Sequence, residues 1–426
     1  MKVLVVGAGG REHALIRKIK ESDKVDSVAC CPGNGGISYD AQCYDVSATD
    51  IDGVVALAKE IKADFVVVAP DDPLVAGMVD ALNKEGFKTF GPTSAAAIIE
   101  GSKVFSKDLM LKYNIPTAEY KVFDKCDDVI TYLKEKNEFP AVIKADGLAL
   151  GKGVIIPETL DEAIAGVKEI MEDKIFGASG NNVVVEEFLT GPEVSVLAFT
   201  DGKCVKPMVS SMDHKRALDG DKGLNTGGMG TVSPNPYYTE DVAKECMEKI
   251  FVPTINAMNS EGRTFKGCLY FGLMITPKGP KVIEYNCRFG DPETQVVLPR
   301  LKTDIMDIFE AINNETLDEL DIEWDDKACT CVIMASGGYP KSYPKGIEIT
   351  GLENGQREGV IVYHAGTAIQ DNKLVTAGGR VLGITALGDT LEEALEKSYA
   401  AVNEIKFDNA HYRKDIGQKA LKAKIC

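Results

Sequence analysis

Two lysines and three glycines stand close together in residues 139–157, F-P-A-V-I-K-A-D-G-L-A-L-G-K-G-V-I-I-P. An apolar run leads to Lys144, and a glycine-rich loop with Gly147, Gly151 and Lys152 separates it from a second apolar run. Glycines let main-chain N–H groups approach a phosphate, and lysines supply the compensating charge. The pattern predicts a strand, an anion-binding loop and a strand. The alternative is a plain hairpin turn on the surface.

This loop differs from the P-loop of nucleotide-binding proteins. Three residues, not four, separate Gly147 from Gly151, and a glycine rather than Ser or Thr follows Lys152. The next segment is predicted to be a strand, so no helix N-terminus is available to hold a phosphate. If a nucleotide binds here, we expect it to lie between two sheets.

A second group of polar residues lies in K-V-I-E-Y-N-C-R-F-G-D-P-E, residues 281–293. Side chains alternate along a strand, so Glu284, Asn286 and Arg288 are expected to share one face. Two oxygen donors beside a guanidinium suit a magnesium ion that carries phosphates, with the arginine holding a carboxylate or phosphate. The alternative is the exposed polar face of an edge strand. A helix is expected to follow at residues 292–312.

The N-terminus shows another phosphate-binding pattern. A buried strand at residues 2–6 is followed by glycines that include Gly9 and Gly10, and then by a helical pattern. Glu12 stands where a dinucleotide-binding motif has its third glycine, so a monophosphate is the more plausible ligand. Strands alternate with helical patterns at residues 51–61 and 74–82 up to about Gly101, which predicts a parallel sheet with ligands at the carboxyl ends of its strands.

Two further segments leave alternatives open. Residues 210–234 form a long, glycine-rich, charged segment that is either a functional loop or disordered. Within it, a hydrogen-bonded surface role for His214 is favoured over a role as a base. A helix is expected after Ser102, and on the pattern alone Lys107 is a solvated residue of that helix.

Composition limits the class of protein. The chain has 426 residues and a formal charge of −17, which predicts several domains and argues against nucleic-acid or acidic-membrane binding. The eleven cysteines lack paired zinc-site spacing, which favours buried thiols in a reducing compartment. No secretory segment or membrane span is predicted. We therefore expect a cytoplasmic enzyme of α/β and α+β class, with a small α+β unit after an acidic connector at residues 315–326.

Several long motifs resemble those of the phosphoribosylamine-glycine ligase family, within the ATP-grasp superfamily. They are V-V-G-A-G-G-R-E-H-A, P-G-N, K-A-D-G-L-A-L-G-K-G, E-E-F-L-T-G-P-E, D-H-K-R with D-G-D-K-G-L-N-T-G-G-M-G, I-E-Y-N-C-R-F-G-D-P-E-T-Q, H-A-G-T and Y-R-K-D-I-G. Their order along nearly the whole chain makes a chance match remote.

The resemblance implies a fold and an activity. It implies a Rossmann-like substrate-binding domain at residues 1–101, an ATP-grasp domain at 102–325 whose lid subdomain covers about 122–190, and a C-terminal domain at 326–426 that closes the site. The expected reaction joins glycine to 5-phosphoribosylamine through glycyl phosphate, with ATP and Mg²⁺ or Mn²⁺. Glycine-rich loops at 147–153 and 220–230 are expected to act as lids. A monomer is expected, and contact with other purine-pathway enzymes is a conjecture that no residue supports.

The same resemblance implies roles for individual residues. Glu284 and Asn286 would be the metal ligands. Catalytic roles fall to Lys144, Arg288 and Asp213, the last two at the carboxylate and amino ends of glycine. The nucleotide would be bound by Lys107, Lys144, Lys152, Glu186, Glu187, Phe188, Leu189 and Glu193, with adenine on the main chain of 186–189 and the ribose on Glu193. The substrates would be bound by Gly9, Gly10, Gly33, Asn34, Asp213, Arg288 and Asp291.

The chain departs from the family pattern at two points. Asp71 stands where the family usually has a glutamate, and the strand at 269–276 lacks the acidic metal ligand of many relatives. Two rival functions are considered. One is another ATP-grasp ligase, such as a biotin-dependent carboxylase, which the D-H-K-R and C-R-F-G-D-P-E-T-Q segments fit poorly. The other is a nucleotide-sensing protein without turnover.

Overall fold

The computed structural model describes residues 1–148, 153–355 and 358–423. Its N-terminal part is a five-stranded sheet in the order β3-β2-β1-β4-β5, and every neighbouring pair is parallel. The strands are β1 (Lys2–Gly7), β2 (Ser27–Pro32), β3 (Gln42–Cys43), β4 (Phe65–Val68) and β5 (Lys88–Phe90). The parallel sheet predicted from the alternating pattern is confirmed.

Helices connect these strands and continue beyond them. They are α1 (Gly10–Lys20), α2 (Ile51–Glu60), α3 (Asp71–Ala76), α4 (Met78–Lys84), α5 (Ser94–Gly101) and α6 (Lys103–Lys112). The sequence predicted one helix across residues 74–82, but Gly77 adopts a left-handed conformation with φ of +95° and separates α3 from α4. Ser102 begins α6 as predicted, because its side chain accepts the N–H of Phe105.

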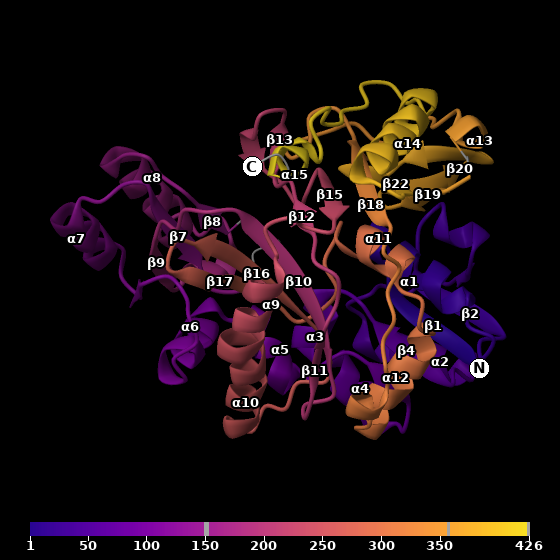
Figure 1. Cartoon of the computed structure of the whole chain (residues 1–426), viewed down its shortest axis with the longest axis horizontal. Coiled ribbons are helices and arrows are strands. Elements are labelled where there is room, and N and C mark those ends of the chain that lie inside the picture. Colours follow the sequence, from indigo (N-terminus) through magenta and orange to yellow (C-terminus); the bar gives the residue numbers. More distant parts are fainter. Residues whose placement is uncertain (149–152, 356–357, 424–426) are drawn as a thin grey trace.

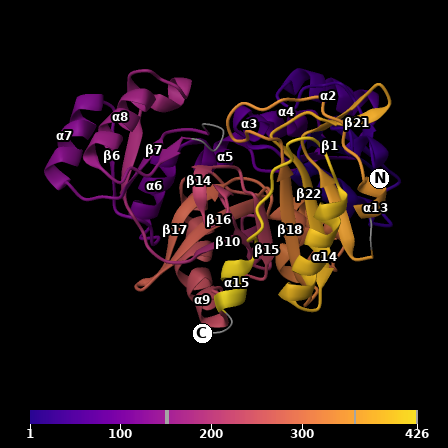
Figure 2. The ribbon, with the colours of Figure 1, turned by 90° about the horizontal axis from the view of Figure 1, so that it is seen from above.

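A separate lobe follows α6 and lies at the left of Figure 1, where Figure 2 also places it. Its antiparallel sheet has the order β6-β9-β7-β8, and two helices accompany it. The elements are β6 (Tyr120–Phe123), α7 (Cys126–Lys136), β7 (Ala141–Ala145), β8 (Val154–Ile155), α8 (Leu160–Met171) and β9 (Val183–Glu187). The predicted strands on either side of the glycine loop are therefore present as the pair β7–β8.

A second antiparallel sheet, in the order β11-β10-β16-β17, faces this lobe. It contains β10 (Glu193–Thr200), β11 (Val205–Pro207), β16 (Gly267–Thr276) and β17 (Gly279–Asn286), with α9 (Glu240–Cys246) and α10 (Val252–Ser260) between β11 and β16 in the chain. A bulge at Ile283 shifts the pairing of β16 and β17, so Glu284 lies opposite Gly272. Beyond β17 the predicted helix at 292–312 is broken into α11 (Thr294–Val297), a short 3₁₀ turn and α12 (Ile305–Asn314).

The third large sheet joins two distant parts of the chain. Its order is β12-β15-β18-β22-β19, where β12 (Met212–Asp213) and β15 (Gly230–Ser233) come from the charged segment at 210–234. The other strands are β18 (Ala328–Ala335), β19 (Val360–His364) and β22 (Arg380–Gly388). The segment between β12 and β15 forms a hairpin of β13 (Arg216–Leu218) and β14 (Lys222–Asn225), so this segment is regular structure rather than a disordered loop.

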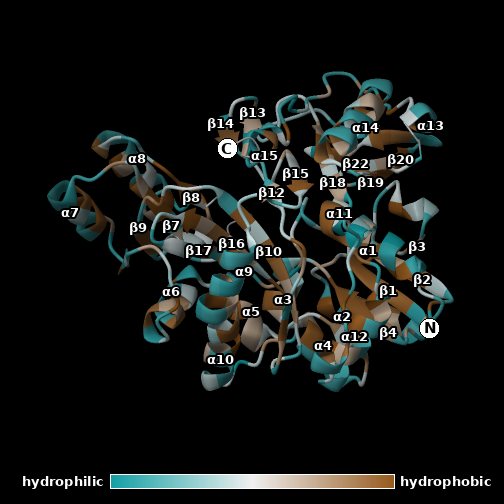
Figure 3. Ribbon diagram, in the orientation of Figure 1, coloured by the Kyte–Doolittle hydropathy of each residue, from teal (hydrophilic) through white to brown (hydrophobic). Residues whose placement is uncertain are grey.

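The C-terminal part completes this unit. The hairpin of β20 (Thr367–Gln370) and β21 (Lys373–Thr376) precedes β22, and the short helix α13 (Leu352–Gly355) lies against α14 (Leu391–Glu404). Helix α14 packs on β18 and β22, and α15 (Gln418–Ala423) ends the described chain. In Figure 3 the strands are hydrophobic along much of their length, whereas outward helices such as α9 are hydrophilic. Within the described ranges, no helix is both long and apolar enough to cross a bilayer.

Candidate active site

A buried carboxylate holds two lysines between the lobe and the facing sheet. Glu186 of β9 lies 3.0 Å from Lys107 Nζ of α6 through one oxygen and 2.9 Å from Lys144 Nζ of β7 through the other. All three side chains are almost fully buried. Burial lowers the pKa of Lys107 to about 8, although Glu186 opposes this shift. Two cations share one carboxylate, so the cluster can accept a further anion such as a phosphate.

This arrangement corrects one prediction and adds a role to a second residue. Lys107 is not a solvated residue of a helix face, as its local pattern indicated, because it is buried and also donates to Thr117 Oγ1 at 2.8 Å. The main chain of Glu186 is expected to receive adenine, and its side chain has a further role that was not predicted, because it pairs with both lysines. Lys144 Nζ further donates to the carbonyl of Ile283 at 2.9 Å, which brings it to the strand that carries Glu284.

The end of β17 carries the predicted metal ligands. Glu284 and Asn286 are half-buried, while Tyr285 between them faces the core. Arg288 lies just beyond the strand and donates to Asn286 Oδ1 at 3.1 Å. Lys215, followed by Lys144 and Lys103, lowers the pKa of Glu284 to about 2, so its carboxylate is ionised. An ionised carboxylate beside an amide oxygen fits a hard cation such as Mg²⁺.

Among the residues whose placement is described, no group of three His, Cys, Asp or Glu side chains could hold a metal ion. Mg²⁺ is commonly bound through one or two carboxylates, with substrate phosphates and water as its other ligands.

Lys215 occupies the space beside Glu284, and no sequence pattern had singled it out. Its Nζ lies 3.3 Å from Glu284 Oε1 and 3.6 Å from Glu193 Oε2. Glu193 itself is about half exposed at the start of β10. The only sequence signal for Lys215 was its place in the charged D-H-K-R segment.

Arg288 faces two carboxylates from the N-terminal part of the chain. Its Nη2 lies 3.0 Å from Glu100 Oε1 and 3.5 Å from Asp71 Oδ2. Glu100 also accepts the N–H of Cys287 at 2.7 Å, and burial raises its pKa to about 7. Glu100 was not predicted because its apolar helix context resembles an ordinary helix end. Asp71, which stands where the resembled family usually has a glutamate, is thus a neighbour of Arg288.

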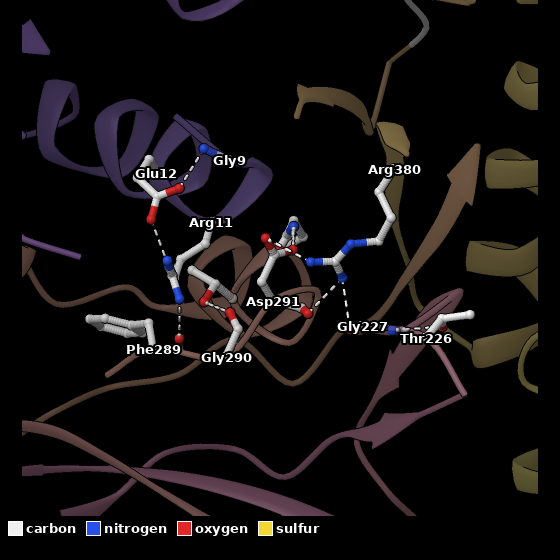
Figure 4. Close-up of polar contacts among 12 residues, drawn as sticks. Gly9, Arg11, Glu12, Thr226, Gly227, Phe289, Gly290, Asp291 and Arg380 are labelled. Atoms are coloured by element: carbon white, nitrogen blue, oxygen red, sulfur yellow. Dashed lines mark hydrogen bonds and ion pairs between the residues drawn. The ribbon is translucent and has the colours of Figure 1, made fainter. Parts of the chain in front are cut away.

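Asp291 pairs with Arg380 of the C-terminal sheet and lies between it and the N-terminal glycine loop (Figure 4). Arg380 of β22 lies 3.2 Å from the Asp291 carboxylate and donates to the main-chain carbonyls of Asp291 and Gly227, both at 2.7 Å. On the other side, a Cβ added at Gly9 would lie 3.3 Å from Asp291 Oδ2. One added at Gly10 would lie 2.6 Å from Gln295 Nε2. These glycines permit a close approach that larger residues would prevent.

The P-G-N turn lies beside the same glycine loop. Gly33 has φ of +74°, and its N–H donates to the carbonyl of Gly7 at 3.1 Å. Asn34 Nδ2 donates to the carbonyls of Ala8 at 2.8 Å and His364 at 2.9 Å. The H-A-G-T segment from the C-terminal part therefore meets the two N-terminal turns, and Gly9, Gly10, Asn34 and Asp291 lie in one region.

Asp213 lies at the end of β12, where burial and the nearby carboxylate of Glu293 raise its pKa well above the usual range. It accepts the N–H of His214 at 2.7 Å. His214 is buried rather than on the surface. Burial lowers its pKa to about 4, and its ring bonds to the carbonyl of Gly230 and accepts the N–H of Gly417.

The predicted nucleotide segment links the two facing sheets. Glu187 ends β9 and accepts Lys281 Nζ at 2.6 Å, Phe188 is 42% exposed and Leu189 is partly exposed. Part of this connection is thus exposed directly after Glu186, which pairs with Lys107 and Lys144. Lys152, also predicted to contact nucleotide, lies outside the described residues.

The two facing antiparallel sheets, with paired lysines and an acidic strand end between them, define an ATP-grasp protein. The biotin carboxylase domain of Hydrogenobacter thermophilus 2-oxoglutarate carboxylase, solved with MgADP and bicarbonate, has a similar fold. Its TM-score is 0.75 at 15% identity, covering 99% of this chain and 93% of that one. Family models for phosphoribosylglycinamide synthetase match residues 1–100 (N domain), 101–294 (ATP-grasp domain) and 329–419 (C domain).

Closer relatives identify the family. The phosphoribosylamine–glycine ligase of Caldanaerobacter subterraneus subsp. tengcongensis is 49% identical over 416 residues, covering 98% of this chain and 99% of that one. The crystal structure of phosphoribosylamine–glycine ligase from Thermotoga maritima has a TM-score of 0.85 at 33% identity, covering 98% and 100% of the two chains. The chain belongs to the phosphoribosylamine–glycine ligase family.

Proposed function

We propose that the chain joins glycine to 5-phosphoribosylamine, using ATP and forming glycinamide ribonucleotide, ADP and phosphate for purine synthesis. Full-length similarity to proteins named for this ligation supports the substrates. The observation that carries the chemistry is the buried Lys107–Glu186–Lys144 cluster next to the ionised Glu284. We propose that it acts on small molecules in the cytoplasm, without a nucleic-acid or membrane partner.

The reaction proceeds in two displacements. A glycine carboxylate oxygen attacks the γ-phosphorus of ATP, the bond to ADP breaks, and glycyl phosphate forms. The amine of 5-phosphoribosylamine then attacks the glycyl carbonyl carbon, phosphate leaves, and the amine loses a proton. No side-chain nucleophile is needed, so catalysis rests on alignment and on stabilising charge that moves from the γ-phosphoryl group to ADP.

Lys107 and Lys144 bind the ATP phosphates in this proposal, because both ammonium groups share only one carboxylate. The main chain at 186–189 receives adenine and Glu193 the ribose hydroxyls. Glu284 and Asn286 would hold Mg²⁺ or Mn²⁺, which would neutralise part of the negative charge of the ATP phosphates. Lys215 lies close enough to Glu284 to meet the transferred phosphoryl group.

The remaining assignments concern the substrates. Gly9, Gly10, Gly33, Asn34 and Asp291 form the phosphoribosylamine region, which the shared contacts among their loops support. Asp213 and Arg288 bind the amino and carboxylate ends of glycine, although Arg288 must do so beside Glu100 and Asp71. We also propose units at 1–101, 102–325 and 326–426 with a lid subdomain at about 122–190, although β12 and β15 pair into the C-terminal sheet.

Phosphate release from ATP and Mg²⁺ tests the function. Glycine and freshly generated 5-phosphoribosylamine are supplied together, and each is then omitted. Release that requires both, matched by glycinamide ribonucleotide, supports the ligase. Release that depends instead on bicarbonate and biotin would favour a carboxylase, and ATP binding without release would favour a nucleotide sensor.

A further inference from the structure

The C-terminal Y-R-K-D-I-G motif has no part in the reaction proposed above, yet it contacts the hairpin that carries Lys215. This hairpin comprises residues 214–226 and includes β13 and β14. At its base, the carbonyl of Lys215 accepts both the N–H and the hydroxyl of Thr226, each at 2.8 Å. The position of Lys215 is therefore tied to the position of the whole hairpin.

Arg413 is the centre of the contact. Its side chain is fully buried, which is uncommon for an arginine unless it is paired. Two of its nitrogens, Nε and Nη2, each lie 2.8 Å from an oxygen of Asp415, while Nη1 reaches Asp221 Oδ1 at 3.0 Å and the carbonyl of Arg216 at 3.1 Å. Because the planar guanidinium is bonded to Asp415 on one side and to the hairpin on the other, both its orientation and its distance from the hairpin are fixed.

The neighbours of Arg413 extend the contact along the hairpin. Asp415 Oδ2 accepts the N–H of Gly220 at 2.8 Å, and Asp219 Oδ1 accepts the N–H of Lys414 at 2.8 Å. At the two ends of the segment 411–417, His411 Nε2 lies 2.7 Å from the carbonyl of Ala217, and the N–H of Gly417 donates to His214 Nε2 at 3.1 Å. These bonds follow residues 411–417 from end to end.

The same contacts reach the turn of the hairpin. Asp221 has φ of +54°, a left-handed conformation that aspartate and asparagine adopt more readily than other non-glycine residues. Its carboxylate pairs with Arg413 and also with Lys419. The contacts of Asp221 thus tie the turn of the hairpin to the C-terminal segment.

We propose that residues 411–419 fix the hairpin at 214–226 and thereby hold the Lys215 ammonium beside Glu284, with Arg413, Asp415 and Asp221 as positioning residues. The hairpin is then a fixed wall of the site rather than a lid, contrary to the expectation for residues 220–230. The structural part stands on the contacts alone, and the consequence for turnover rests on the proposed ligase function.

Asp221→Asn tests the contact with little risk to folding, because asparagine is isosteric and tolerates the left-handed conformation. Asp408→Asn is the matched control. It makes the same chemical change on an exposed residue of the C-terminal part for which the described structure records no side-chain contact.

Hydrogen exchange of peptides from 214–226 is measured first, in the full-length protein. Asp221→Asn is expected to speed exchange there by about tenfold and Asp408→Asn to leave it unchanged. The kcat of Asp221→Asn, corrected for the folded fraction, should fall on the order of tenfold, while the KM for 5-phosphoribosylamine stays within about twofold. A general loss of structure would instead speed exchange elsewhere.

Unchanged hairpin exchange in Asp221→Asn would overturn the proposal, and so would a loosened hairpin with wild-type kcat. Protection of the hairpin from exchange only after ATP is added would also overturn it, because a lid closes on binding. The exchange measurement needs no turnover. A wild-type protein that forms no glycinamide ribonucleotide would therefore refute the proposed function, while hydrogen exchange would still decide whether residues 411–419 fix the hairpin.

Discussion

The Lys215 ammonium lies 3.3 Å from the Glu284 carboxylate, although 69 residues separate them in the chain. This ion pair places a cation beside the carboxylate that, in the proposed function, would also bind a metal ion with its phosphate groups. Lys215 is therefore an ion-pair partner of Glu284, whereas Glu284 would be a ligand of the metal ion.

Replacing Glu284 tests its role as a metal ligand. Glu284→Gln keeps the shape but removes the charge that binds a hard cation. We expect turnover to fall on the order of a hundredfold or more, several kcal/mol of transition-state stabilisation, with a higher half-saturating Mg²⁺ concentration. Steady-state kinetics across a Mg²⁺ series measure both. Near-normal turnover at ordinary Mg²⁺ would refute the assignment of Glu284 as a metal ligand.

Lys215→Met should give the opposite metal response. It removes a cation that meets the phosphoryl group in our proposal, so kcat should fall on the order of a hundredfold. The half-saturating Mg²⁺ concentration should not rise, because Glu284 keeps its charge and loses a competing cation. The same Mg²⁺ series is used, with Lys222→Gln on the exposed part of the hairpin as the control. A higher half-saturating Mg²⁺ concentration in Lys215→Met would show that Lys215 supports the metal site instead.

The pKa of Lys107 near 8 predicts a limit on the basic side. Below that pH the ammonium is charged and attracts phosphate; as pH rises through about 8 the charge is lost, so kcat/KM for ATP should fall. Glu186 raises this pKa, so Glu186→Gln should move the fall to lower pH. Lys107→Arg should remove it, because arginine stays charged.

The pH profile of kcat/KM for ATP provides the measurement for these three proteins. If kcat/KM for ATP falls at the same basic pH in wild type, Glu186→Gln and Lys107→Arg, a group other than Lys107 is responsible for the fall.

Gly36→Ala tests the contact between the N-terminal and C-terminal parts. Gly36 has an ordinary φ of −83°, so alanine is not strained there, but its Cβ would lie 1.9 Å from Cγ of the His364 ring. Overpacking of this kind is expected to lower the free energy of unfolding by about 1–3 kcal/mol. Urea unfolding measures it. His364→Ala in the same chain should restore part of the loss, and no restoration would mean that the clash is relieved elsewhere.

Local patterns predicted much of the site. The strands around the glycine loop, the shared face of Glu284 and Asn286 and the parallel N-terminal sheet all follow from alternation and glycine placement over a few residues. These features depend on short-range geometry, which a single sequence displays directly.

Contacts between distant segments were not predictable in this way. The pairing of Glu100 with Arg288, of Arg380 with Asp291 and of Lys215 with Glu284 depends on tertiary packing that no local pattern encodes. Lys107 shows the same limit: its helix was predicted but its burial was not, because the lobe that covers it comes later in the chain. Gly77 divided a predicted helix through a backbone conformation that periodicity does not report.

The sheet that joins β15 to β18 has a consequence for synthesis of the chain on the ribosome. Strand β15 is made well before its partner β18, and the hairpin beside it contacts residues that follow 192 and 203 positions later in the chain. The N-terminal parallel sheet can form early, since all its strands lie within the first 90 residues. The wall that carries Lys215 is completed only after residues 411–417 have been translated, so a nascent chain that ends before them does not yet have an assembled site.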